Sequence, residues 1–179
     1  AGAGSPQLKE ILQPGEGWTL VGEGYVFTEG PAANAQGEVV FNDTRGNTTY
    51  KINASGQVAK LLDDTQGANG QAFGPDGRRY VVTVGANQIR AYDAEGRHTV
   101  VAEGFRGNDL VARHDGSLYV TNPDRTGAEP SKVWLIRPNG EKSVVDAGLR
   151  FANGVALSPD QSLLYVADSR THWVYSYQI

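Results

Sequence analysis

Four oxygen-bearing side chains recur along this sequence at intervals of 40, 39 and 45 residues. Each stands directly before a short apolar stretch, and the set contains no cysteine and no histidine. Carboxylate and amide oxygens without sulfur or imidazole are the ligands that a hard cation such as Ca²⁺ prefers. If the fold brings these side chains together, they form an oxygen-lined cation site. The four residues are Glu29, Asn69, Asn108 and Asn153.

The segments that begin at these residues resemble one another. They read "EGPAANAQGEVVFND", "NGQAFGPDGRRYVVT", "NDLVARHDGSLYVTN" and "NGVALSPDQSLLYVAD". A turn residue follows seven positions after each start, and an apolar or aromatic residue follows the turn. Self-similarity at a fixed period indicates a repeat architecture. The aligned turn residues are Gln36, Asp76, Asp115 and Asp160, and the aligned apolar or aromatic residues are Val40, Tyr80, Tyr119 and Tyr165.

Two further strand-like pieces separate successive repeats. "NTTYKINASGQVAKLLDD", "NQIRAYDAEGRHTVVAEG" and "KVWLIRPNGEKSVVDAG" each alternate apolar residues around a tight turn that contains Gly or Asn. Four short antiparallel strands per period of about 40 residues are typical of a β-propeller blade. We therefore predict an all-β fold, a β-propeller of four-stranded blades with about four blades in residues 18–179, after an N-terminal extension of residues 1–17.

The fourth repeat stops at "WVYSYQI", after its third strand. Propellers often close by borrowing a terminal strand, so "WTLVGEGYVF" could supply the missing outer strand and close a four-bladed ring. Alternatively, these blades are the first part of a larger ring. An open blade edge has unpaired N–H and C=O groups, which favour association. We therefore expect a second chain or fragment that completes the ring, or a self-complementing dimer.

The first strand of each propeller blade lines the central channel, so equivalent residues of successive blades form a ring. Glu29 and its three asparagine equivalents should then converge at one channel mouth. Asn-Gly is also a common turn pair, and one such asparagine alone would be interpreted as a loop cap. Four aligned positions, one of them a carboxylate that is costly to bury unpaired, favour the cation site.

Composition excludes several other kinds of protein. The net charge is −4 and the charges are dispersed, so no basic stripe marks a nucleic-acid or membrane surface. The absence of cysteine excludes disulfides, thiolate metal sites and a cysteine nucleophile. It is compatible with either an oxidising or a reducing cellular compartment. No GxSxG motif is present. The three histidines, His98, His114 and His172, share no metal-triad spacing and are interpreted as surface or turn residues.

Three segments together resemble motifs of the family that unites gluconolactonases, senescence marker protein and luciferin-regenerating enzyme. They are "TEGP" at 28–31, "FRGNDLVARHDGSLYVTNP" from Phe105 and "FANGVALSPDQSLLYVADS" from Phe151, and the likeness covers roughly residues 20–177. The resemblance implies a six-bladed propeller that hydrolyses sugar or related lactones. It also implies one divalent cation in the channel, for which Ca²⁺ is our first expectation and Zn²⁺ or Mg²⁺ the alternatives.

The same resemblance assigns roles to particular residues. It implies that Glu29 and Asn153 are metal ligands, and that Asn108 lies beside the metal and also contacts substrate. Arg106 corresponds to a substrate-binding arginine of some members, whereas Asn69 shares only the repeat position and is a further substrate-binding candidate. The family's general base is an aspartate of the fifth blade, which would lie beyond Ile179. We therefore expect little or no turnover from this chain alone.

Two nearby aspartates are not expected to replace that base. Strand alternation should turn Asp109 away from Asn108, and Asp168 ends a second strand, where capping a turn is the simpler role. The principal functional hypothesis is a metal-dependent lactonase with a small lactone as substrate. The alternative is a non-catalytic propeller, a binding or scaffold module in which the cation only braces the channel, because one fold can serve many functions.

Overall fold

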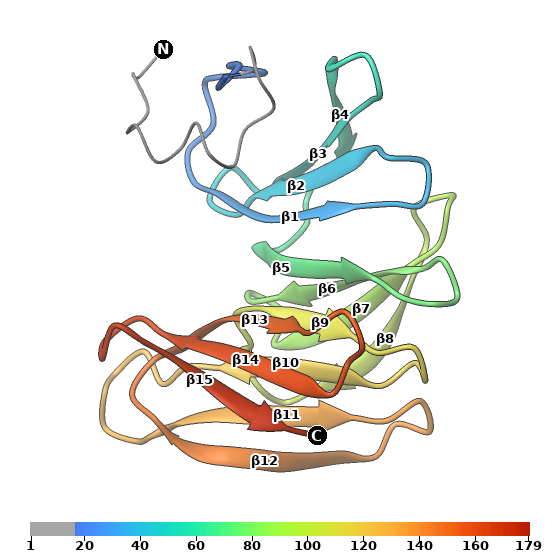
Figure 1. Cartoon of the computed structure of the whole chain (residues 1–179). Helices are drawn as coiled ribbons and strands as arrows, with labels where there is room; N and C mark the ends of the chain where they lie inside the picture. Colours follow the sequence, from blue (N-terminus) through green and yellow to red (C-terminus); the bar gives the residue numbers. More distant parts are fainter. Residues whose placement is uncertain (1–16) are drawn as a thin grey trace.

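The computed structural model describes residues 17–179, and these form an all-β structure of fifteen strands (Figure 1). The strands belong to four separate sheets, one per sequence repeat. The first sheet contains β1 (Thr28–Ala33), β2 (Val39–Asp43), β3 (Thr48–Ile52) and β4 (Val58–Leu62). The second contains β5 (Ala68–Phe73), β6 (Arg79–Thr83), β7 (Gln88–Tyr92) and β8 (His98–Glu103).

The third sheet contains β9 (Leu110–Ala112), β10 (Leu118–Asn122), β11 (Ser131–Ile136) and β12 (Lys142–Leu149). The fourth has only three strands, β13 (Ala152–Leu157), β14 (Leu163–Asp168) and β15 (Trp173–Gln178). Every sheet is an antiparallel meander in sequence order, and its first strand packs against the first strand of the next sheet. This is the blade arrangement of a propeller, so the predicted all-β propeller with four blades is confirmed.

Strand register confirms the repeat alignment residue by residue. Val40, Tyr80, Tyr119 and Tyr165 each pair with the equivalent residue of their own first strand, namely Ala32, Ala72, Val111 and Ala156. In blades one, two and four the register shifts just after the residue at the repeat start. Such a shift is the mark of a β-bulge, which often re-aims a side chain beside a functional site.

Apolar side chains fill the spaces between successive blades. One buried cluster, which includes Val82, Leu110 and Leu118, joins the second blade to the third, and another, which includes Tyr119 and Val166, joins the third to the fourth. Aromatic side chains of the outer strands also pack between blades. Trp134 packs against the first cluster and stacks on Phe105, and Tyr175 and Tyr177 pack against the second cluster.

Asp168 is a structural cap, as expected from its place at the end of β14. Its carboxylate accepts hydrogen bonds from the backbone N–H groups of Arg150, Phe151, Arg170 and Thr171. Burial opposes ionisation here, but these four donors outweigh it and keep the pKa of Asp168 below its usual value. Asp168 therefore fastens the loop that enters blade four and takes no part in the channel.

The N-terminal segment does not close the ring in the way that the sequence suggested. Residues 18–27 form no strand, and the fourth blade keeps three strands. Tyr25 packs edge-on against Phe41 and Tyr50 of the first blade, so aromatic packing holds this segment on blade one. Of the expected extension 1–17, only Gly17 lies within the described residues. No helix in the described part of the chain is long and apolar enough to cross a bilayer.

Successive first strands approach one another very closely at the end where each repeat begins. The backbone N–H of Gly70 donates to the carbonyl of Asn108 at 3.0 Å, directly linking blades two and three. A side chain at Gly70 would collide with the backbone and carboxylate of Asp109 and come within 2.8 Å of the Asn108 carbonyl. Glycine at this position is therefore a packing requirement of the channel wall.

We expect Gly70→Ala to lower the free energy of unfolding by about 1 to 3 kcal/mol, because rigid backbone of the next blade must move. Gly154 occupies the equivalent position of blade four, but an added methyl group there meets nothing closer than 3.9 Å. Gly154→Ala is therefore the matched control and should change stability far less. Urea unfolding of both variants measures the difference; equal effects would contradict the close-approach argument.

Candidate functional site

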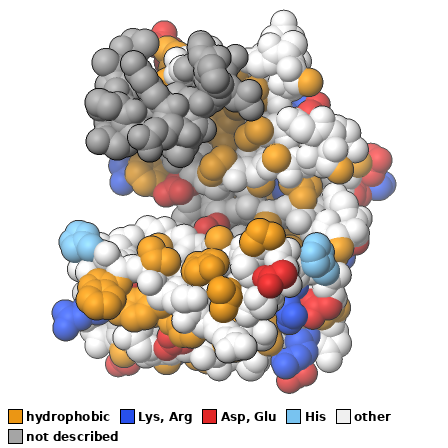
Figure 2. Space-filling model, viewed as in Figure 1, with side chains coloured by type: hydrophobic (Ala, Val, Ile, Leu, Met, Phe, Trp, Pro, Cys, Tyr) orange, Lys and Arg blue, Asp and Glu red, His pale blue; other side chains and the backbone are white. Residues whose placement is uncertain are grey.

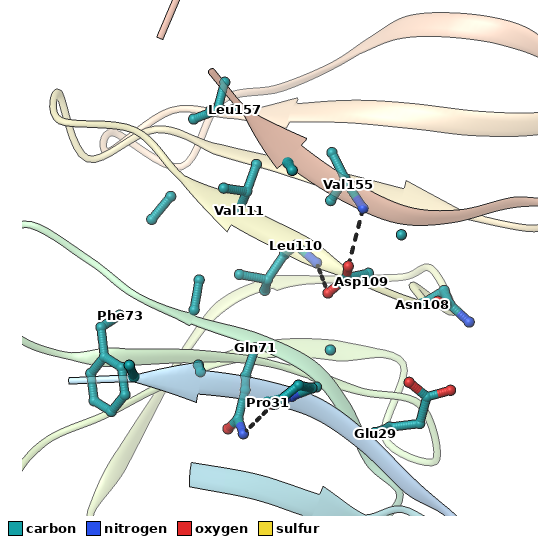
Figure 3. A pocket seen from close by; sticks show the side chains of 18 of the residues that line it. Glu29, Pro31, Gln71, Phe73, Asn108, Asp109, Leu110, Val111, Val155 and Leu157 are labelled. Atoms are coloured by element: carbon teal, nitrogen blue, oxygen red, sulfur yellow. Dashed lines mark hydrogen bonds between the residues drawn. The ribbon is translucent and has the colours of Figure 1, made fainter. Parts of the chain in front are cut away.

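The first strands of all four blades enclose a central cavity of about 680 Å³ (Figure 3). Its wall consists of parts of β1, β5, β9 and β13, of Asn108 and Asp109 just before β9, and of turn residues that follow β9 and β13. Figure 3 shows Glu29, Asn108 and Asp109 at one end of this cavity, and Phe73 and Leu157 toward the other. The carboxylates of the cavity therefore lie at the end where each repeat starts, as the propeller geometry required, while His114, Ser158 and Gln161 line the other end.

Three of the four residues at the repeat start, Glu29, Asn108 and Asn153, line this cavity. Asn153 donates its side-chain Nδ2 to Ser169 Oγ at 3.0 Å, which leaves its Oδ1 without a donor among the described residues. Glu29 is half-buried, and its carboxylate has no hydrogen bond or ion pair within residues 17–179. A carboxylate and an amide oxygen are thus free to bind a ligand in the same cavity.

Asn69 shares the repeat position but lies outside the cavity wall. It is 6% exposed, and its Oδ1 is buried without a hydrogen-bond partner. Its backbone carbonyl accepts a hydrogen bond from Asn42 Nδ2 at 2.6 Å, across the interface between blades one and two. The structure therefore places Asn69 behind the other three residues, inside an inter-blade contact.

In blades two, three and four the backbone carbonyl at the repeat start is fixed by the preceding blade. Asn42 Nδ2 bonds Asn69 O, Gly70 N bonds Asn108 O, and Thr121 Oγ1 bonds Asn153 O at 2.5 Å. Asn42 and Thr121 occupy the same place in their blades, one residue before the end of the second strand. The residues of the proposed ring are thus positioned through their main chain as well as their side chains.

Arg106 lies in a neighbouring pocket of about 320 Å³ that Arg125 and Lys132 also line. Arg125 donates from Nη1 to Arg106 O and from Nη2 to Gly107 O, so it is held against the segment that leads to Asn108. Burial and the nearby charge of Arg106 lower the pKa of Arg125. Asp124 and Glu129 line this pocket too, so its charges are mixed. Since two residues of chain span at most about 7 Å, the pocket adjoins the site of Asn108.

Asp109 was wrongly expected to turn away from Asn108. It precedes the first residue of β9, Leu110, so strand alternation does not govern it, and its side chain lines the same cavity (Figure 3). Oδ1 accepts the N–H of Leu110 at 2.9 Å and Oδ2 accepts that of Val155 in the next blade at 3.1 Å. The sequence did contain a signal, because Asp109 stands where the other repeats have glycine.

Burial raises the pKa of Asp109 to about 6, and the negative charge of Glu29 adds to the effect, although two backbone N–H groups oppose it. Two carboxylates thus face a common cavity, where amide oxygens of Asn108 and Asn153 also lie. Within the described residues no cluster of three or more His, Cys, Asp or Glu side chains could hold a metal. The donors instead are mixed carboxylate and amide oxygens, which fit a hard divalent cation.

A propeller with an oxygen-lined channel mouth defines the class of this protein. The sequence model of one family, described as the SMP-30/Gluconolactonase/LRE-like region, matches residues 27–179. The chain belongs to this family, which confirms the resemblance inferred from its motifs. Among curated proteins, the gluconolactonase of Zymomonas mobilis subsp. mobilis (strain ATCC 31821 / ZM4 / CP4) is 28% identical over 207 residues, covering 96% of this chain and 58% of that protein.

Solved structures show the same fold. An X-ray structure described as a gluconolactonase candidate has a TM-score of 0.85 at 23% identity, covering 97% of this chain and 67% of that one. The gluconolactonase XC5397 of Xanthomonas campestris has a TM-score of 0.79 at 25% identity over 87% and 59%. Regucalcin of Agrobacterium tumefaciens, a calcium-binding protein, has a TM-score of 0.72 at 19% identity over 87% and 55%. This chain thus spans little more than half of the length of most of these relatives.

The raised pKa of Asp109 has a measurable consequence for stability. A carboxyl group that binds its proton more tightly in the folded state adds stability below its unfolded pKa near 4, and loses it as the pH rises through about 6. With cations chelated, we expect the wild-type advantage over Asp109→Asn to shrink by on the order of 3 kcal/mol between pH 4 and pH 7. Chemical unfolding at several pH values measures this difference.

Nuclear magnetic resonance of the Asp109 carboxyl carbon provides an independent check. Its titration midpoint should lie near 6, and Glu29→Gln should lower it because one nearby negative charge is removed. A midpoint below 4.5 in the wild-type chain would contradict the assignment of Asp109 to the buried cavity wall.

Proposed function

We propose that this protein is part of a metal-dependent lactonase of the gluconolactonase type. The observation that carries the proposal is the carboxylate of Glu29, which has no partner among the described residues and shares a cavity with the amide groups of Asn108 and Asn153. A divalent cation would neutralise this carboxylate, and its preferred oxygen ligands are already present. Membership of the family and the 28% identity to a gluconolactonase support lactone hydrolysis as the reaction.

A lactone is a cyclic ester, so its hydrolysis needs a polarised carbonyl and an activated water. When bound, the cation would supply both effects through Lewis acidity. Glu29 and Asn153 would hold it, and Asn108 would contact both cation and substrate. Arg106 would orient hydroxyl groups of the substrate from the adjoining pocket, with Arg125 bonded to its backbone carbonyl. Asn69 is buried and would not contact the substrate directly. It would affect binding only by positioning the residues next to it.

Ca²⁺ is the cation we propose first, with Zn²⁺ and Mg²⁺ as alternatives. The donors are oxygen atoms of carboxylate and amide groups, and no cysteine or histidine side chain lies among these ligand candidates. The structural similarity to regucalcin, which is described as calcium-binding, is consistent with this choice. We further propose that the general base is an aspartate of another blade.

A non-catalytic role for the cation is the second candidate. It is favoured by Asp109, a carboxylate of the channel wall whose two oxygens each accept a backbone N–H, one from its own blade and one from the next. Such a residue braces two blades, and a cation beside it could brace the channel in the same way. Measuring hydrolysis and cation binding separately distinguishes the two candidates.

We propose that a further blade covers β15, supplied by a second chain, a fragment or another copy of this chain. Figure 2 shows hydrophobic side chains gathered over the surface of blade four. Trp173 and Val174 of β15 are each 66% exposed, although the same sheet buries Leu164 and Val166. Exposed apolar residues on an open sheet edge mark a surface that pairs with another strand.

Cation binding by the chain tests the proposed site. We expect Ca²⁺ to bind with one-to-one stoichiometry in calorimetry, and Glu29→Gln to weaken binding roughly tenfold or more because it removes the ligand charge. Glu103→Gln is the matched control, since Glu103 is an exposed β8 carboxylate far from the cavity wall, and its affinity should not change. Unchanged affinity of Glu29→Gln would refute the proposed ligand.

Lactone hydrolysis tests the proposed reaction. The assay uses a purified preparation whose intact mass shows that the blades completing the ring are present. We expect hydrolysis of glucono-1,5-lactone that disappears with EDTA and returns with Ca²⁺, because the cation supplies the polarisation that the side chains lack. Hydrolysis that is insensitive to chelation would overturn metal dependence. Cation binding without hydrolysis would replace the lactonase by the bracing role.

A further inference from the structure

Arg79 occupies a position where the other blades have an aliphatic residue, which is half-buried in blade one and fully buried in blades three and four. It is the first residue of β6 and pairs with Phe73, just as Val39, Leu118 and Leu164 pair with the equivalent residues of their blades. Leu118 and Leu164 are 1% and 2% exposed, and Arg79 is only 5% exposed. The second blade therefore buries a guanidinium group at a position that elsewhere is filled by aliphatic packing.

Among the described residues no negatively charged group pairs with Arg79. Its Nη1 donates to Gln71 Oε1 at 2.6 Å, and its guanidinium lies over the ring of Tyr92 at 4.7 Å. No ion pair involves Arg79 within residues 17–179. A guanidinium has five N–H donors, and the bond to Gln71 uses one of them. Burial lowers the pKa of Arg79 to about 10, so the group remains charged at neutral pH. A buried unpaired charge is costly unless an anion accompanies it.

Arg79 also lines a cavity of about 470 Å³ between blades one and two. Its apolar lining comes from Val40, Leu61, Leu62, Phe73 and Tyr92, and Asn34 and Gln36 add uncharged polar groups. The carboxylates that line it are already engaged by basic side chains. Glu38 pairs with Lys51 at 2.8 Å, and Asp93 pairs with Arg97 at 2.8 Å.

Phe73 lines both this cavity and the channel cavity, but this cavity is distinct from the oxygen-bearing end of the channel. It lies beside the β1–β2, β5–β6 and β7–β8 turns, whereas the oxygen-bearing residues lie where the first strands begin. Along β5, Asn69 and Phe73 are four residues apart, which corresponds to about 13 Å of extended strand. The apolar walls and the single buried cation also differ in chemistry from the mixed oxygen donors of the channel.

We propose that the cavity between blades one and two is a second binding site, which takes an amphipathic monocarboxylate. Its carboxylate would accept the free N–H groups of Arg79, and charge-assisted bonds of this kind are the strong ones. Its hydrocarbon part would lie against Leu62, Phe73 and Val40. A volume of some hundreds of Å³ with apolar walls and one oriented charge is typical of small-molecule sites. The proposal does not depend on lactone hydrolysis or on the channel cation.

Calorimetry with three probes tests the two parts of this recognition on the full chain. We expect hexanoate to bind with one-to-one stoichiometry. Acetate keeps the charge but lacks the hydrocarbon, and hexan-1-ol keeps the hydrocarbon but lacks the charge, so each should bind at least tenfold more weakly. Absence of hexanoate binding to the wild-type chain, or equal binding of hexan-1-ol, would overturn the proposal.

Arg79→Leu removes the charge and restores the aliphatic residue of blades three and four, so the variant should fold, as circular dichroism can verify. We expect its affinity for hexanoate to fall at least tenfold. Arg78→Gln is the matched control, because Arg78 is the neighbouring arginine, half-exposed and paired with Asp76, and should leave hexanoate binding unchanged. Equal hexanoate binding by wild type and Arg79→Leu would show that Arg79 is only a structural brace.

A spectroscopic measurement on the wild-type chain keeps the proposal testable should Arg79→Leu fail to fold. Hexanoate should shift the side-chain N–H resonance of Arg79 and leave that of Arg78 in place. Shifts of Arg78 alone, or of neither arginine, would refute the site.

Discussion

The close contact between successive first strands is the constraint on which the rest of this structure depends. At each inter-blade step one hydrogen bond fixes the main-chain carbonyl of the residue that starts the next repeat, with donors Asn42, Gly70 and Thr121. Glycine at position 70 makes the approach sterically possible. Because these bonds, one from a backbone N–H and two from side chains, hold the main chain of each repeat start against the preceding blade, the side chains at the repeat start project from a rigid wall. A site built in this way is preorganised before any ligand arrives.

The electrostatics of the channel follow from the same contact. The approach that buries Asp109 beside Glu29 also places two backbone N–H groups on its carboxylate, so one residue is both destabilised by burial and held by hydrogen bonds. A cavity with two carboxylates, and with no basic partner for Glu29 among residues 17–179, would attract a cation. The proposed cation site and the joint between blades three and four are therefore parts of one physical arrangement.

Residues that depart from the repeat pattern have roles beyond filling the space between blades. Asp109 replaces a glycine and connects two blades, and Arg79 replaces a core leucine and faces an apolar cavity. Gln71, which stands where the third and fourth blades have Leu110 and Val155, bonds both Arg79 and the carbonyls of Gly30 and Val40. A repeat protein provides its own internal comparison, and polar residues at otherwise apolar positions are informative because burying them is costly.

The sequence alone determined the period, the strands of each blade and the identity of the residues that share a channel position. These follow from local patterns, namely strand alternation and turn chemistry, repeated about every 40 residues. Only the tertiary structure decided that Asn69 is buried behind the cavity, that Arg106 lies in an adjoining pocket, and that Asp109 faces the channel. The reason is that a bulge or an irregular segment before a strand breaks alternation, and burial depends on neighbours some 40 residues away along the chain.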